Sequence, residues 1–567
     1  MLFLRRASSW YPVAGGAAVA AAAAAAVSPG GLGNERTAAC RAASARQAVH
    51  PQLQAEAEAD VVVENWSGTH TASPAAYFQP DSPAAVQRIL SLMHEIGGRL
   101  RVVGSALSPN GLGLSDEPML NMVQCGAVLH VDTEAKQVTV QAGARVSEVV
   151  EALRPHGLTL QNYASIAEQQ IGGFLQVGAH GTGAGVPPVD EQVIRMVLHT
   201  PALGPIELSH EQNQKLFYLC KVGLGWLGVV SEVTLQCVDA HKLVQHTFVE
   251  TREGLKKRHL EHLRHQHMRY MWIPHTDSVV VVTCDRVPEG HTPPASAAAA
   301  PDELAATKPL RELLLSASRD KGGGGGKAYS RREAEGMNFA QLRDALLALA
   351  PLDKAHVVAV NTAEAEYWKA VQGFRVDWSD KLLGFECGGQ QWVSEVAMPC
   401  GTRSAPDGRD LAYMEELLGL IEASDLPTPA PIEQRWTKRS RARMSPAHSW
   451  GEDDLHTWVG IIMYLPTDDA AQRGAITERF WEYNNLCRQK LWDKYGCHQH
   501  WAKIEVPDDD AERERVRGRL AERFPLAELY AAKQKFDPKG VLGNDLIDAL
   551  LLPDEALLLK KLRSMAP

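Results

Sequence analysis

Residues 169–183 read QQIGGFLQVGAHGTG, a stretch with five glycines and no Lys, Arg, Asp or Glu. Glycine is needed where the backbone takes a positive φ or comes very close to a ligand. A flat, anionic cofactor held largely by main-chain N–H groups requires a stretch of this kind. The sequence therefore predicts a cofactor-lining wall here, and we expect the rest of the chain to complete that site or to bring a substrate to it.

The composition of the chain is that of a soluble enzyme with more than one domain. Its 567 residues are enough for two or three cores, and 45% hydrophobic with 22% charged residues is ordinary for a globular enzyme. The net charge of −10 argues against a nucleic-acid binder. The nine cysteines form no C-x-x-C pair, so neither a disulfide framework nor a zinc site is indicated, and no metal site is predicted.

The first fifty residues differ in composition from the rest. They carry five arginines against a single acid, Glu35, and they are rich in alanine, which is typical of an organelle transit peptide. The apolar run at residues 13–27 is shorter than the roughly 20 residues that a membrane span needs. We therefore expect residues 1–60 to be a leader and the folded chain to begin near Val61.

Local patterns predict several elements of the first half of the chain. They indicate helices at 82–96 and 146–153, a hairpin of strands at 128–131 and 137–142, and strands at 100–103, 193–200 and 229–235. The loop at 104–111, GSALSPNG, follows the strand at 100–103 and holds two glycines and two hydroxyls. Consecutive N–H groups of such a loop can form an anion-binding nest, so it is expected to face a pyrophosphate.

The segment GLGWLG at residues 223–228 matches the G-x-G-x-x-G pattern of dinucleotide-binding folds. A true fingerprint follows a strand and opens a helix. Here the segment precedes Val229–Leu235, which alternates like a strand. The match is therefore rejected as a nicotinamide site and is interpreted as part of the same cofactor wall.

The character of the sequence changes from about residue 241. Strands are predicted at 279–284, 431–437 and 458–464. Residues 287–338 are biased towards Pro, Ala and Gly and are interpreted as a surface insertion with one helix near 303–316 and no chemistry. Glu433 and Arg435 stand two apart on the predicted strand at 431–437, so both side chains share one face. A surface ion pair is the commoner meaning of such spacing; the alternative is a carboxylate and a guanidinium that bind a polyhydroxylated substrate together.

Seven blocks, in order along the chain, resemble the L-galactono-1,4-lactone dehydrogenases, flavoproteins of the vanillyl-alcohol-oxidase type. They are VGSALSPNG, EQQIGGFLQVGAHGTGAGVPPVDEQV, GLGWLGVVSEVTLQC, FECGGQQWVSE, APIEQRWTKRS, TWVGIIMYLPT and HWAKIE. The resemblance implies an α+β fold: a two-subdomain FAD-binding domain of PCMH type at 61–240, a cap domain with an antiparallel sheet over the flavin at 241–530, and a C-terminal segment, 531–567, that returns to the FAD domain.

The resemblance also implies a function. It is the FAD-dependent oxidation of L-galactono-1,4-lactone to ascorbate, with electrons passed to cytochrome c, at the mitochondrial inner membrane facing the intermembrane space. Two alternatives remain open: an aldonolactone or sugar-alcohol oxidase that uses oxygen, and an assembly factor for respiratory complex I.

Particular positions take roles from the same resemblance. Leu107 stands where relatives attach the flavin through a histidine, which implies non-covalent FAD. Ala142 is expected at the reactive edge of the flavin, where its methyl group would obstruct oxygen. Glu433, Arg435 and Lys503 are the expected catalytic residues. The expected cofactor-binding residues are Gly104, Ser105, Ala106, Leu107, Ser108, Asn110, Gly111, Ala142, Gly172, Gly173, Gly178, His180, Gly181, Thr182, Gly183, Gly228, Val229 and His500. Cys387 is a candidate reactive thiol, although a buried, inert cysteine is commoner.

Overall fold

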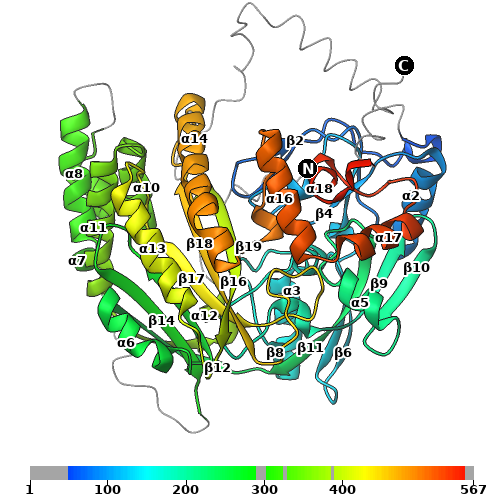
Figure 1. Ribbon diagram of the computed structural model, residues 1–567, viewed down its shortest axis with the longest axis horizontal. Coiled ribbons are helices and arrows are strands. Elements are labelled where there is room, and N and C mark those ends of the chain that lie inside the picture. The colour runs from blue at the N-terminus through cyan, green and yellow to red at the C-terminus, as the bar shows by residue number, and fades with distance from the viewer. Residues whose placement is uncertain (1–48, 289–301, 323–327, 385–387, 556–567) are drawn as a thin grey trace, which may run out of the picture.

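The computed structural model describes residues 49–288, 302–322, 328–384 and 388–555. Most of the expected leader and the candidate thiol Cys387 lie outside these ranges. Figure 1 shows two bodies side by side: an N-terminal domain that carries the last helices of the chain, and a cap domain built on one large sheet. No helix among the described residues is long and apolar enough to cross a membrane.

The N-terminal domain is built from two main sheets. A small parallel sheet has the order β3-β5-β4, and an antiparallel sheet has the order β10-β9-β11-β7-β6, with β8 paired to β11; β1 and β2 form a separate pair. The strands are β1 (Val63–Glu64), β2 (Thr71–Ala72), β3 (Tyr77–Phe78), β4 (Arg101–Val103), β5 (Met119–Asn121), β6 (Val128–Asp132), β7 (Gln137–Gln141), β8 (Leu158–Leu160), β9 (Val193–Thr200), β10 (Gly204–Ser209) and β11 (Val229–Asp239). The helices are α2 (Pro83–Ile96), α3 (Val146–Leu153), α4 (Ile171–Gln176) and α5 (Gln214–Cys220).

The cap domain is organised around an eight-stranded antiparallel sheet with the order β15-β12-β14-β13-β17-β18-β16-β19. Its strands are β12 (Lys242–Thr251), β13 (His267–Trp272), β14 (Ser278–Arg286), β15 (Gly373–Trp378), β16 (Gln391–Thr402), β17 (Ile432–Lys438), β18 (Asp454–Tyr464) and β19 (His498–Gln499). Its helices are α6 (Arg252–His262), α7 (Glu303–Ala306), α8 (Lys308–Gly322), α9 (Arg331–Glu335), α10 (Phe339–Leu349), α11 (Lys354–Ala370), α12 (Ser379–Leu383), α13 (Arg409–Ala423), α14 (Ala470–Cys487) and α15 (Asp493–Tyr495). One sheet face packs against α13 and α14 in a core of large apolar side chains.

Several predicted elements are confirmed, and their ends have a local cause. The helix expected at 82–96 is α2: the Ser82 side chain accepts a hydrogen bond from Ala85 N–H, and the helix ends at Gly97, whose φ is 64°. The hairpin is β6 and β7, and GLGWLG precedes β11 as expected. The observed sheets and helices confirm the α+β class.

The insertion at 287–338 is more structured than its composition suggested. The single helix expected near 303–316 is two helices, α7 and α8, and Leu310 and Leu314 of α8 are fully buried. They share a core with α10 and α11, so the described part of the insertion belongs to a helical layer of the cap. Its leucines recur with helical spacing, which the bias towards Ala, Gly and Pro concealed.

Residues before Val61 and before residue 531 already contact the N-terminal domain. Leu53 is fully buried in the domain core, so the folded part of the chain begins before Val61. At the other end, the Trp501 and Ile504 carbonyls accept hydrogen bonds from the Asn110 side chain, so the chain contacts the N-terminal domain ahead of residue 531. The helices that follow are α16 (Asp510–Arg523), α17 (Leu526–Phe536) and α18 (Asp545–Leu551). Leu100 N–H donates to the Val541 carbonyl at 2.8 Å, which joins the two ends of the domain.

Replacing Lys533 by Met tests this return of the chain. The buried Lys533 ammonium donates to the Trp226 carbonyl at 2.9 Å and pairs with Asp537 at 2.6 Å. Its loss would leave Asp537 buried without its cation, at a cost of about 3–5 kcal/mol. We expect a clearly lower melting temperature by calorimetry. Lys494→Met breaks an exposed pair with Glu416 and should cost less than about 1 kcal/mol. Equal losses in both variants would contradict this assignment.

Candidate active site

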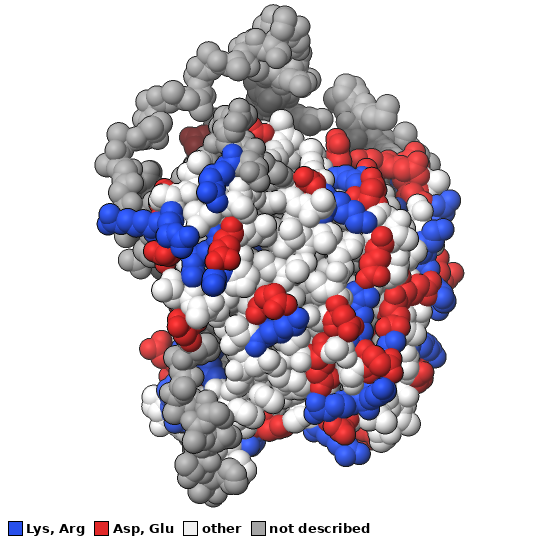
Figure 2. Space-filling model, turned by 90° about the vertical axis from the view of Figure 1, so that its left-hand side faces the viewer, with Lys and Arg blue, Asp and Glu red and all other residues white. Residues whose placement is uncertain are grey.

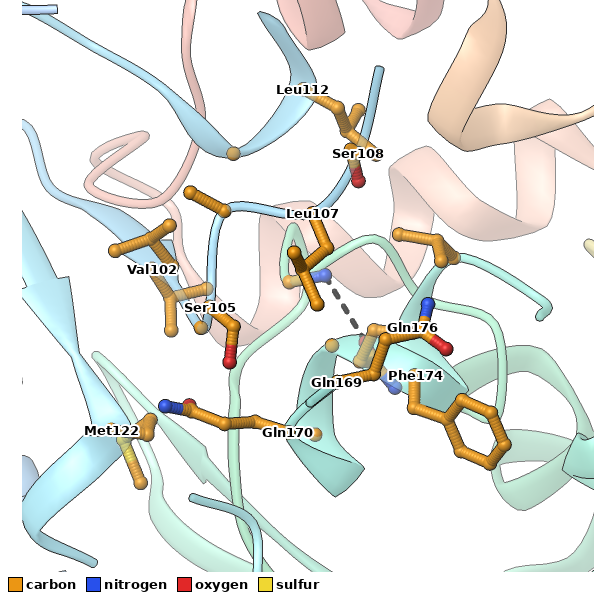
Figure 3. A pocket seen from close by; sticks show the side chains of 18 of the residues that line it. Val102, Ser105, Leu107, Ser108, Leu112, Met122, Gln169, Gln170, Phe174 and Gln176 are labelled. Carbon is orange, nitrogen blue, oxygen red and sulfur yellow. Dashed lines mark hydrogen bonds between the residues drawn. The ribbon is translucent and has the colours of Figure 1, made fainter. Parts of the chain in front are cut away.

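One cavity runs between the first loop of the N-terminal domain, helix α4 and the segment before β11. The space between its lining residues, open mouth included, is about 890 Å³. Nine of the expected cofactor residues line it: Gly104, Ser105, Ala106, Leu107, Ser108, Asn110, Ala142, Gly172 and Gly173. Figure 3 shows the Leu107 side chain pointing into the cavity, between Ser105 and Gln169.

The polar groups of the cavity suit an anionic, polar-edged ligand. Among the described residues, none accepts a hydrogen bond from the backbone N–H groups of residues 105–108. Ala106 within this loop has a φ of 52°, a conformation that costs a non-glycine residue energy and that often marks a binding site. The side-chain oxygens of Gln169 and Gln170 are buried without a partner in the described structure. These groups are the orphaned donors and acceptors that a bound cofactor would satisfy.

The first pair of glycines in the glycine-rich stretch has two separate roles. A Cβ on Gly172 would lie 3.1 Å from the Ala142 methyl group, so Gly172 allows α4 to pack against the turn that follows β7. A Cβ on Gly173 would meet nothing within 4 Å, because this residue opens onto the cavity. Ala142 is itself buried and lines the cavity wall.

The other expected cofactor residues do not line this cavity: Gly111, Gly178, His180, Gly181, Thr182, Gly183, Gly228, Val229 and His500. Packing explains their glycines. A Cβ on Gly181 would lie 2.1 Å from Asn162 Oδ1, and one on Gly228 would lie 2.6 Å from the Leu198 side chain. Gly183 bridges to Thr437 of the cap. This second part of the glycine-rich stretch therefore joins the two domains.

Sequence reasoning did not single out other residues that line the cavity. Its wall also includes Arg101, Met122, Gln176, Leu224 and Gly225. Gln176 Oε1 accepts from Gly225 N–H at 3.1 Å (dashed in Figure 3), and its amide group donates to the Cys220 carbonyl at 2.8 Å. The first contact places part of GLGWLG at the cavity. Gln176 could not be found from the sequence, because no local pattern distinguishes a buried glutamine on a helix from an ordinary exposed one.

The register of the cap sheet brings charged side chains onto the face opposite its apolar core. Glu433 of β17 and Glu395 of β16 both lie opposite Gly460 of β18. In the next row on this face, Arg435 lies between Trp458 and Arg269. The predicted placement of Glu433 and Arg435 on one face of a strand is confirmed, because Gln434 between them and Trp436 after them point into the cap.

The charged groups form a connected set. Glu433 Oε1 lies 3.2 Å from Arg269 Nη1, and Glu433 Oε2 lies 3.4 Å from Arg435 Nε. Arg435 also pairs with Glu395 at 2.5 Å, and the Lys503 ammonium pairs with the other oxygen of Glu395. The side chains of Glu433 and Lys503 are 21% and 16% exposed, against 8% for Arg435 and 3% for Glu395. Glu433 and Lys503 are thus more accessible than Arg435, and Glu395 is the most buried member of the set.

Two buried histidines border this set in their neutral form. Burial lowers the pKa of His180 to about 4, which Glu395 only partly offsets, and burial together with Lys503 places the pKa of His500 well below its usual value. His180 Nε2 lies 3.2 Å from Glu395 Oε2, and its ring stacks on Trp458 at 3.7 Å. His500 Nδ1 accepts from Ala502 N–H, which orders the turn that carries Lys503. Both imidazoles are structural supports of the charged set.

The cavity and the charged set meet at Asn110. The Asn110 side chain, which lines the cavity, donates to the carbonyls of Trp501 at 2.9 Å and Ile504 at 2.7 Å. Trp501 begins the turn η8 (Trp501–Lys503), and Ile504 directly follows Lys503 at its end. A ligand in the cavity would therefore lie near the turn that carries Lys503.

Comparison with known proteins agrees with this geometry. A family model described as FAD binding domain matches residues 74–206, and one described as D-arabinono-1,4-lactone oxidase matches residues 340–550. The mitochondrial L-galactono-1,4-lactone dehydrogenase 1 of Oryza sativa subsp. japonica is 52% identical over 492 residues, covering 86% of this chain and 83% of its own length. The Arabidopsis thaliana enzyme of the same name is 49% identical, with 86% and 81% covered.

The chain belongs to the L-galactono-1,4-lactone dehydrogenase family. L-gulonolactone oxidase of Bos taurus is a more distant relative, 28% identical over 85% of this chain and 97% of its own. Among solved structures, cholesterol oxidase from B. sterolicum is similar with a TM-score of 0.64 and 15% identity, covering 89% of this chain and 99% of its own; it shares the fold.

The cavity fits the cofactor of this dehydrogenase family. Its N–H-lined loop, its buried glutamine oxygens and its open glycine suit FAD, whose dinucleotide part is anionic and whose ring is flat. The matched FAD-binding region contains all of these residues. FAD is therefore the cofactor that the N-terminal domain binds.

Replacing Gly173 by Leu should lower the FAD affinity of this dehydrogenase. The new side chain would enter the cavity without meeting protein atoms near its Cβ, so folding should be retained. We expect the purified variant to carry little flavin by absorbance and to bind added FAD weakly by titration. Gly419→Leu makes the same change on an exposed face of α13, where a Cβ also meets nothing within 4 Å, and should leave FAD content unchanged. A fully flavinylated Gly173→Leu protein would refute the placement.

Proposed function

We propose that this protein oxidises the C2 hydroxyl of L-galactono-1,4-lactone and passes the electrons to cytochrome c, which completes ascorbate synthesis. The observation that carries the proposal is the charged set of Glu433, Arg435 and Lys503 beside an FAD cavity. It stands in a chain about half identical to proteins named L-galactono-1,4-lactone dehydrogenase. The relatives are also named mitochondrial, and we propose the inner membrane facing the intermembrane space as the location.

The side chains supply what a polyhydroxylated lactone requires. The accessible Glu433 carboxylate accepts hydrogen bonds from substrate hydroxyls, while Arg269 and Arg435 hold it in place. The Lys503 ammonium, partly exposed and paired with Glu395, would stabilise negative charge that develops on the reacting oxygen. Arg435, more deeply buried, adds positive charge from below.

FAD in the cavity would supply the hydride acceptor. We propose that residues 104–108, Gln169, Gln170 and Gly173 hold it, the first through backbone N–H groups. Leu107 has no nucleophilic atom, so this position cannot attach the flavin, and we propose non-covalent binding. The buried methyl group of Ala142 lines the same wall and restricts the approach of oxygen, which favours a protein acceptor over oxygen.

The surface charge is compatible with a basic protein as the electron acceptor. The net charge of the chain is −10. On the cap face seen in Figure 2, acidic and basic side chains are interspersed around a largely uncharged area. Attraction of a basic partner would then come from the overall charge and weaken with salt.

The proposed function is tested with the purified, FAD-loaded protein. L-galactono-1,4-lactone should reduce cytochrome c rapidly, with little hydrogen peroxide formed from oxygen. Glu433→Gln removes an accepting charge and should lower kcat/KM for the lactone by about 10- to 100-fold. Glu415→Gln, which removes a carboxylate paired with Lys256 elsewhere on the cap, should change it little. Stoichiometric peroxide with wild-type protein would instead support an aldonolactone oxidase.

Ala142→Gly tests the proposed barrier to oxygen. Removal of the methyl group should raise the rate of peroxide formation during turnover and leave lactone-dependent cytochrome c reduction largely intact. Ala144→Gly is the matched control, since Ala144 is equally buried in the same segment but does not line the cavity. The barrier is located elsewhere if both variants, or neither, react faster with oxygen.

A further inference from the structure

Glu395 occupies a position in the site that no local pattern in the sequence marks. It lies on β16, and the strand register sets it opposite Gly460, with Glu433 on the far side of that glycine. Because Gly460 has no side chain, the face between the two carboxylates stays open. A Cβ on Gly460 would be 3.8 Å from Glu395 Oε1.

The Glu395 carboxylate is the point where three segments of the chain meet. Its Oε1 pairs with Arg435 from β17 at 2.5 Å. Its Oε2 receives the Lys503 ammonium from η8 and lies 3.2 Å from His180 Nε2, which comes from the N-terminal domain. Its own carbonyl accepts from His500 N–H at 2.9 Å, which fixes the start of the turn that carries Lys503.

The position of the Lys503 ammonium depends on the Glu395 carboxylate. Within the described part of the chain, the Lys503 ammonium makes its only hydrogen bond to Glu395. A lysine side chain has a long flexible stem, so one strong anchor decides where its charge lies. The Lys503 and Arg435 charges would also repel each other without the anion between them.

A metal ion is a poorer occupant of this cluster. His180, Glu395 and His500 have the residue types and proximity of a metal site. Both oxygens of Glu395 already carry ion pairs, and the two cations that make them would oppose a third positive charge. The Lys503 ammonium stands where such an ion would bind the carboxylate.

We infer that Glu395 is the positioning residue of this active site: its carboxylate holds Arg435 and Lys503 in place on the substrate side of the FAD cavity. Glu395 acts through those two cations and does not itself touch substrate, because it is buried beneath them. The inference rests on the proposed function for its kinetic test only.

The first test needs no turnover. Folded, FAD-loaded wild type and Glu395→Gln are labelled with limiting acetic anhydride, and lysine modification is quantified by mass spectrometry. Lys503 should be modified severalfold faster in the variant, because its ammonium has lost the carboxylate that holds it. Lys438, which pairs with Asp453 outside the cluster, serves as an internal reference and should not change. An unchanged rate at Lys503 would overturn the inference.

The kinetic test separates positioning from general stability. Glu395→Gln should lower kcat/KM for the lactone by about 10- to 100-fold, mostly through kcat. Glu364→Gln is the matched control: Glu364 is another buried carboxylate, bonded to Trp368 within α11 and outside the cavity, and its variant should keep wild-type kinetics. An equal loss in both variants would show a structural effect only and overturn the inference.

A double variant tests whether Glu395 acts through Lys503. The combined loss in Glu395→Gln with Lys503→Met should be smaller than the product of the single losses, whereas independent sites multiply. If Glu395→Gln does not fold, Glu395→Asp replaces it in both tests, with a smaller loss expected and the same coupling to Lys503→Met. Multiplicative losses would overturn the inference. Wild-type protein that does not oxidise the lactone would refute the proposed function, and the labelling result would still decide the role of Glu395.

Discussion

A buried carboxylate must be paired, and the partners of Glu395 come from both domains. The desolvation free energy of an isolated buried carboxylate would exceed the net stability of a folded domain. Burial alone would raise the pKa of Glu395, but Lys503 and Arg435 hold it well below its usual range. The cations come from η8 and β17, and His180 comes from the N-terminal domain. The full ring of hydrogen-bond and ion-pair partners around Glu395 is therefore complete only when the cap lies against the FAD domain.

Local signals were sufficient for those elements whose causes are local. The helix α2 has its cap and its proline within four residues, and its buried side chains recur with helical spacing. Strand β17 is short, but its period of two was enough to place Glu433 and Arg435 on one face. The loop at 104–108 was recognisable because glycine and hydroxyl residues follow a strand directly.

The role of Glu395, and the different roles of the glycines within residues 169–183, are set by distant parts of the chain. Glu395 stands alone on β16, and its partners His180 and Lys503 are 215 and 108 residues away. Their meeting depends on the strand order β17-β18-β16-β19, which no short pattern encodes. Composition likewise could not show that Gly173 opens onto a cavity while Gly181 packs against Asn162, because glycine meets both needs in the same way.

Contacts on the core face of the cap sheet fix the register of β17, and the register decides which side chains lie on the opposite face. If β17 slipped by one residue, Gln434 would replace Glu433 on the substrate side, and every side chain would change faces. Three hydrogen bonds on the core side oppose that slip. Gln434 accepts from Trp272 at 3.0 Å and donates to the Asp410 carbonyl at 3.1 Å, while Trp436 donates to Asp410 Oδ2 at 2.9 Å. All of these groups are buried, so a slipped strand would leave several unsatisfied at about 1–3 kcal/mol each. The direction of Glu433 and Arg435 is thus set by residues that never reach the substrate.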